Sequence, residues 1–174
     1  AGTGGFSSRN SSVAFYDSAY IDGVITVFMI LFGINFNMYY LLLLKKVKDV
    51  FKNEEVRAYL GAILGATLLI TINILSIYEK PLKAFRYAVF QVSSIITTTG
   101  FVTADFNLWP MFSQCILLGL MVFGACAGST GGGMKVSRIL ILIKSVKREL
   151  KRLLHPKSVA IVKVNGKKVG SNGT

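Results

Sequence analysis

Hydrophobic residues gather in three long blocks along this chain, and none of the blocks contains a charged residue. The first two blocks cover residues 24–44 and 58–78, and the third covers residues 108–127. An α-helix rises ~1.5 Å per residue, so a helix of such a length spans the ~30 Å hydrocarbon core of a bilayer. The pattern therefore predicts three transmembrane helices of a polytopic membrane protein.

The stretch between the second and third blocks is too apolar for an ordinary exposed loop. Residues 84–96 hold enough apolar positions for a helix of about three turns, which is too short to cross a bilayer. The run Thr97-Thr98-Thr99-Gly100-Phe101 then stops the helix. A short helix that enters, stops and returns as extended chain is a re-entrant pore loop, tolerated where protein or a water-filled cavity surrounds it. An amphipathic helix on the external membrane surface is the alternative.

The chain carries this loop pattern twice. Thr3-Gly4-Gly5-Phe6 matches Thr98-Thr99-Gly100-Phe101 in outline, and each copy precedes a predicted transmembrane helix. A filter for potassium replaces the hydration shell of the ion with closely held backbone carbonyls, and glycine adopts the required backbone angles without a Cβ penalty. The candidate filter residues are Thr3, Gly4, Gly5, Thr98, Thr99 and Gly100.

The repeat suggests how the chain is organised. We expect a filter loop and outer transmembrane helix over residues 1–44 and a cytoplasmic loop over residues 45–57. A complete helix–pore loop–helix repeat follows over residues 58–133, and a basic cytoplasmic part occupies residues 134–174. Since the chain starts within a loop and one unit cannot enclose a pore, the sequence is interpreted as a fragment.

A glycine-rich run interrupts the third block near its inner end. Each glycine in a helix costs ~1 kcal/mol relative to alanine, so this run is predicted to form a loop below the filter. A segment of low local stability is what a gate requires. The run does not match a phosphate-binding loop, because Met134 and Val136 stand where that motif needs other residues. The candidate gating residues are Gly124, Gly128, Ser129, Thr130, Gly131, Gly132 and Gly133.

Charge then orients the chain in the membrane. The formal net charge is +12, and sixteen of the twenty basic residues lie in two stretches, 45–57 and 135–168. The positive-inside rule assigns both stretches to the cytoplasm, so the charge indicates topology and not nucleic-acid binding. Two cysteines and one histidine leave no disulfide framework and no four-ligand zinc site.

The basic tail has two predicted elements. Residues 139–154 alternate apolar and basic positions with helical spacing. Residues 159–169 read as a small β-hairpin around Asn165-Gly166, the preferred pair of a type I′ turn.

Three stretches together resemble the TrkH family, the membrane subunits of bacterial Trk potassium uptake systems in the Trk/Ktr/HKT superfamily. They are Gly4-Gly-Phe-Ser-Ser-Arg-Asn, Ile96-Thr-Thr-Thr-Gly-Phe-Val-Thr-Ala-Asp-Phe followed by Trp109-Pro110, and Gly124-Ala-Cys-Ala-Gly-Ser-Thr-Gly-Gly-Gly-Met-Lys-Val-Ser-Arg138. The resemblance extends to Arg148-Glu-Leu-Lys-Arg-Leu-Leu-His-Pro156, so it covers essentially the whole chain.

This resemblance implies an all-α membrane protein of four helix–pore loop–helix repeats around one potassium-channel-like pore. The chain would hold the filter and outer helix of the second repeat, all of the third repeat and the linker toward the fourth. Lys135 and Arg138 would lie at the inner mouth of the pore. The family implies potassium as the transported ion, a homodimer in the bacterial inner membrane, and a cytosolic nucleotide-binding subunit similar to TrkA. It implies no enzymatic activity, organic cofactor or nucleic-acid partner.

Two other classes compete with a potassium conduit. A secondary transporter for another solute also uses broken helices, but it is expected to place a charged or aromatic substrate site at the midplane. A non-conducting membrane anchor for a cytosolic partner would explain the basic tail but not the repeated loops. An enzyme is disfavoured because the apolar blocks hold no cluster of acid, base and nucleophile.

Overall fold

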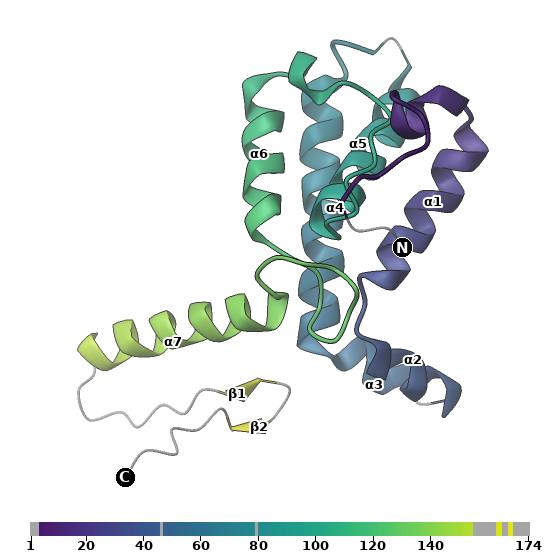
Figure 1. Ribbon diagram of the computed structural model, residues 1–174. Helices are drawn as coiled ribbons and strands as arrows, with labels where there is room; N and C mark the ends of the chain where they lie inside the picture. The colour runs from purple at the N-terminus through teal and green to yellow at the C-terminus, as the bar shows by residue number, and fades with distance from the viewer. Residues whose placement is uncertain (1–3, 46, 79, 155–162, 165–166, 169–174) are drawn as a thin grey trace.

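The protein is an almost entirely helical assembly in which short loops are held between longer helices (Figure 1). The structure is a computed structural model and describes residues 4–45, 47–78, 80–154, 163–164 and 167–168. Its elements are η1 (Ser12–Tyr16), α1 (Ala19–Phe32), α2 (Phe36–Leu43), α3 (Val47–Lys52), α4 (Glu54–Ile74), α5 (Pro81–Ile96), η2 (Phe106–Leu108), α6 (Met111–Val122), α7 (Val136–Leu154), β1 (Lys163–Val164) and β2 (Lys167–Lys168).

Helix α4 is the central element and has two different apolar faces. The helix is capped by Asn53, whose side chain accepts the backbone N–H groups of Glu55 and Val56. One face is buried against α5 and α6 and contains Tyr59, Ile63, Ala66, Ile70 and Ile74. The opposite face leaves Leu64, Leu68 and Ile72 63%, 57% and 68% exposed. A stripe of exposed leucine and isoleucine without charges suits contact with lipid or with further protein.

The predicted transmembrane helices differ from the observed ones in their bounds. Among the described residues, α4 by itself is long and apolar enough to cross a bilayer, while α1 and α2 meet that measure only as a pair. The second block is therefore helical, but its helix starts at Glu54 and ends at Ile74. The third block is helical only over α6, because Pro110 precedes its first turn and the glycines from Gly124 onward follow its end.

The transmembrane helix predicted over residues 24–44 is not continuous. Helices α1 and α2 are bent by 92° at residues 33–35. A Cβ atom on Gly33 would lie 2.0 Å from the hydroxyl oxygen of Tyr59, so the chain passes very close to α4 here. The side chain of Asn35 then starts a new helix by accepting the N–H of Asn37 at 2.9 Å. The break is thus built by a close approach followed by a cap.

Helix α5 occupies the place expected for a pore helix, between α1 and α4 (Figure 1). It starts at Pro81, one turn earlier than the sequence pattern suggests. Arg86 ties it to α1 through Asp22, with 3.3 Å between Nε and Oδ2. Its inward face is buried along the length of the helix, in contrast to the alternative of a helix lying free on a surface.

Helix α6 packs against α4 through polar as well as apolar contacts. The Ser113 hydroxyl donates to the Asn73 side chain at 2.7 Å, and the Trp109 indole N–H donates to the Tyr78 hydroxyl at 3.3 Å. Hydrogen bonds between helices satisfy polar groups that would be costly against lipid.

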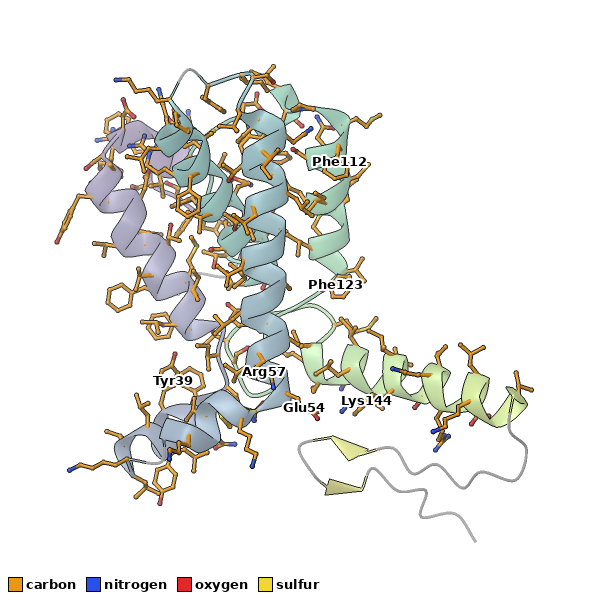
Figure 2. All side chains as sticks on the ribbon, turned by 180° about the vertical axis from the view of Figure 1, so that it is seen from behind. Tyr39, Glu54, Arg57, Phe112, Phe123 and Lys144 are labelled. Carbon is orange, nitrogen blue, oxygen red and sulfur yellow. The ribbon has the colours of Figure 1, made fainter. Side chains whose placement is uncertain are left out.

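The basic segments gather at one end of the molecule. Helices α2, α3 and α7 lie near the N-terminal end of α4 in Figure 1. Figure 2 shows Lys144 of α7 beside Glu54 of α4, and the two side chains form an ion pair. This grouping agrees with the assignment of residues 45–57 and the basic tail to the same membrane side. Helix α7 begins at Val136, three residues before the predicted start.

The predicted hairpin falls largely outside the described residues. Strands β1 and β2 pair antiparallel, with Lys163 opposite Lys168 and Val164 opposite Lys167. Residues 159–162, 165–166 and 169 lie outside the described part of the chain, so the type I′ turn stays a prediction.

The close approach at Gly33 gives a stability prediction. Gly33→Ala is expected to lower the thermal stability of the complete protein in detergent, because the new methyl group overlaps the buried ring of Tyr59. Overpacking of this kind costs about 1–3 kcal/mol. The control is Gly23→Ala in α1, where a Cβ atom meets nothing within 4 Å. Equal melting temperatures for the two variants would contradict the prediction.

Candidate ion-conduction site

The loop after α5 is held by the last turns of that helix. The Ser94 hydroxyl donates to the carbonyl of Phe101 at 2.7 Å, and the Ser94 carbonyl accepts the N–H of Thr99 at 2.9 Å. The Thr97 hydroxyl donates to the Ser93 carbonyl at 2.6 Å. Ser93 and Ser94 are fully buried. The loop is therefore fixed on the helix that precedes it and does not hang free.

These two serines were not among the predicted site residues. Two adjacent small hydroxyl residues in the last turns of a short helix, just ahead of a Thr-x-Gly run, are the signal that could have identified them. Their role is positional, since they hold the loop through its main chain.

The two Thr-x-Gly-Phe copies lie side by side. The Thr99 carbonyl accepts the N–H of Gly5 at 2.7 Å and the N–H of Gly4 at 3.2 Å. Gly5 and Gly100 have φ angles of +71° and +81°, which side-chain-bearing residues rarely adopt. A Cβ atom on Gly100 would lie 2.8 Å from the Gly5 nitrogen. Glycine is thus required here both by backbone angle and by space. Thr3 lies outside the described residues.

A second set of contacts joins the two copies further along. The Ser12 side chain accepts the N–H of Val102 at 3.2 Å, and the Val102 carbonyl accepts the N–H of Ala14 at 3.1 Å. The segments that leave the two loops are therefore paired as well as the loops themselves.

Residues 123–135 between α6 and α7, called here the glycine segment, form a loop that closes on itself. Phe123 and Met134 form an isolated parallel bridge, and the Gly124 N–H donates to the Met134 carbonyl at 2.8 Å. The Val136 N–H donates to the Ala125 carbonyl at 3.3 Å. The run from Gly124 to Gly133, predicted to be non-helical, lies within this loop.

The glycine segment contacts the candidate filter directly. The Gly132 N–H donates to the Thr98 hydroxyl at 2.7 Å. Thr98 itself has a φ angle of +55°, an uncommon conformation for a β-branched residue. Strain of this type costs on the order of 1–3 kcal/mol and often marks functional positions.

The remaining predicted residues surround the same segment. The Thr130 hydroxyl donates to the Phe32 carbonyl at 3.3 Å, and the Ser129 hydroxyl donates to the Cys126 carbonyl at 2.6 Å. The Lys135 ammonium group donates to the Gly131 carbonyl. Arg138 lies in the first turn of α7, and its N–H donates to the Lys135 carbonyl at 2.9 Å.

A cavity of about 210 Å³ connects the two predicted features. Thr97, Thr99 and Phe101 of the filter loop line it, together with Thr130 of the glycine segment. The α1 residues Val24, Ile25, Phe28, Met29 and Phe32 complete its wall. The cavity thus has threonine side chains on the side of the two loops and apolar side chains on the side of α1.

No three carboxylates, thiols or imidazoles come together in the part of the chain that the structure describes.

Comparisons with known proteins agree with this architecture. The sequence profile of the TrkH family, described as a cation transport protein, matches residues 2–172. The Trk system potassium uptake protein TrkH of Salmonella typhimurium is 39% identical over 167 residues, which cover 94% of this chain and 35% of that protein. TrkG of Escherichia coli is 33% identical, covering 94% of this chain and 34% of TrkG.

A solved structure shows the same fold. The crystal structure of the potassium transporter TrkH from Vibrio parahaemolyticus superposes with a TM-score of 0.86 at 39% identity, covering 94% of this chain and 36% of the solved chain. The present chain spans about a third of the length of the relatives that it matches.

Proposed function

This chain belongs to the TrkH family of cation transport proteins, and we propose that the complete protein carries potassium ions into the cell. Potassium would lose its water at a filter built from Thr3, Gly4, Gly5, Thr98, Thr99 and Gly100. The names of its relatives, Trk system potassium uptake proteins, support the choice of ion.

The contact between the two Thr-x-Gly-Phe loops is the observation that carries this proposal. Gly5 and Gly100 are distant in sequence, yet each occupies the position where a Cβ atom on the other would collide. Backbone carbonyls crowded together without side chains between them are what a potassium filter needs.

The glycine segment is proposed to be the gate. It lies against the filter through Thr98 and lines the same cavity through Thr130. Residues Gly124 to Gly133 would block the path in the position seen here and open it when displaced. Lys135 and Arg138 would lie at its inner mouth.

The family resemblance supports the rest of the assignment. Residues 1–44 would contribute to a second repeat, residues 58–133 would form a third, and residues 134–174 would lead to a fourth, with residues 45–57 as a cytoplasmic connection. The complete protein would be a multi-pass homodimer in the bacterial inner membrane, regulated by a TrkA-like nucleotide-binding subunit. It would have no enzymatic activity and no organic cofactor.

Growth on limiting potassium tests this proposal. Bacteria without potassium uptake systems are expected to grow at submillimolar potassium when they express the complete protein, and to take up radioactive rubidium as a potassium substitute. Failure of both, with the protein present in the membrane, would overturn the proposal. Uptake of an organic solute instead would favour the secondary transporter, and the absence of any flux would favour the membrane anchor.

A further inference from the structure

Glu55 in the first turn of α4 contacts the glycine segment. Its Oε1 atom accepts the N–H of Ala127 at 2.6 Å, although the two residues belong to different parts of the chain. The Glu55 residue is only 6% exposed. A carboxylate is rarely buried to this extent unless its oxygens have partners. The sequence alone does not mark Glu55, because a glutamate in the first turn of a helix is ordinary.

The local structure of α4 fixes where this carboxylate points. Asn53 caps the helix by accepting the N–H groups of Glu55 and Val56, at 2.9 and 3.3 Å. The cap sets the direction of the first turn of α4. The backbone of Ala127 thus meets a carboxylate acceptor whose place is set by the start of the helix.

The bend between α1 and α2 holds the same stretch from another side. The Cys126 N–H donates to the Gly33 carbonyl at 3.1 Å, and the Gly128 carbonyl accepts the N–H of Phe36 at 3.3 Å. The Glu55 bond lies between these two in sequence. Three consecutive residues, Cys126, Ala127 and Gly128, thus each form a hydrogen bond to another part of the chain. Among these three bonds, the one from Ala127 has a carboxylate as its acceptor.

We propose that Glu55 is a positioning residue that holds the glycine segment in its blocking position through the N–H of Ala127. The effect of Glu55 on transport rests on the proposed function, because displacement of the glycine segment opens an ion path only if this segment is the gate. The position of the glycine segment can be measured independently of ion transport. A hydrogen bond to a charged group, once removed, is expected to raise the population of the displaced segment about tenfold to a hundredfold.

The two cysteines provide a measurement of the segment position. Cys126 is buried next to Ala127, whereas Cys115 on α6 is exposed. We would treat the complete protein in detergent with N-ethylmaleimide and follow both cysteines by mass spectrometry of their peptides. Cys115, which is already exposed, is the internal reference for reagent reactivity, and Cys126 reports displacement of the segment.

Three variants separate the contribution of the bond from that of the charge. Glu55→Ala removes the acceptor and is expected to raise the Cys126 modification rate about tenfold or more while the Cys115 rate stays unchanged. Glu55→Gln keeps an acceptor oxygen and is expected to restore most of the protection. Glu149→Ala removes a carboxylate on α7 that pairs with its neighbour Arg148, and it is expected to change neither rate.

The outcomes distinguish this inference from the proposed function. An unchanged Cys126 rate in Glu55→Ala, or equal increases at both cysteines, would overturn the role of Glu55. If wild-type protein transports no potassium while Cys126 responds as expected, the proposed function is overturned and the positioning role is supported. If wild type transports potassium, Glu55→Ala is expected to give a higher potassium efflux from resting cells than Glu55→Gln.

Discussion

Gly100→Ser is expected to remove most of the discrimination between potassium and sodium in the complete protein. The φ angle of +81° is unfavourable for serine, and its Cβ atom would lie 2.8 Å from the Gly5 nitrogen and 2.9 Å from the Gly5 Cα atom. Both atoms belong to main chain, so they cannot rotate away as a side chain does. The two loops must move apart, and their carbonyls lose the spacing that suits a dehydrated potassium ion.

The size of this effect follows from the strain. An unfavourable backbone conformation costs on the order of 1–3 kcal/mol, and each 1.4 kcal/mol corresponds to about a tenfold change in an equilibrium. We expect the ratio of potassium to sodium uptake to fall about tenfold or more, measured by competing flux in cells that express the complete protein.

Gly119→Ser is the matched control for this change. Gly119 lies within α6, and a Cβ atom there meets nothing within 4 Å. Serine in place of this helical glycine is expected to leave selectivity unchanged. Unchanged selectivity in Gly100→Ser as well would show that the loop is not the filter.

Local signals in the sequence predicted the elements well. Uncharged apolar blocks identified α4 and α6, and the short apolar stretch before Thr97 identified α5. Periodicity is a local property, and it specifies which residues are helical even when the packing partners are unknown. The meeting of the two filter loops was also expected, because the Thr-x-Gly-Phe pattern occurs twice and a filter needs its copies together.

Features that depend on tertiary contacts could not be predicted from the sequence. Gly33 and Asn35 can mark a break within residues 24–44, but the bend of 92° also depends on Tyr59 of another helix lying against Gly33. Glu55 is similar, since its importance comes from the position of Ala127 and not from its neighbours in sequence. Buried polar anchors of this kind become visible only when the chain is folded.

Deletion of residues 128–133 is expected to give a potassium path that no longer closes. The deletion removes the bond from Gly132 to Thr98 and the bond from Thr130 to Phe32, which hold the glycine segment against the filter and α1. The deletion joins Ala127 directly to Met134, so α6 and α7 stay connected by a shorter loop. We expect potassium efflux from resting cells to rise at least about tenfold, since several anchors worth roughly 0.5–1.5 kcal/mol each are lost together.

The selectivity of this leak separates a missing gate from a damaged filter. The filter loop is held by Ser94 and by the Gly5 contact, and neither is touched by the deletion. The leak should therefore still prefer potassium to sodium, in contrast to Gly100→Ser, where preference is lost. Thr130→Ala removes a single 3.3 Å bond and is expected to leak only slightly. Tight closure after the deletion would exclude the glycine segment as the gate, and a leak without preference would mean that the segment supports the filter and does not block the path beneath it.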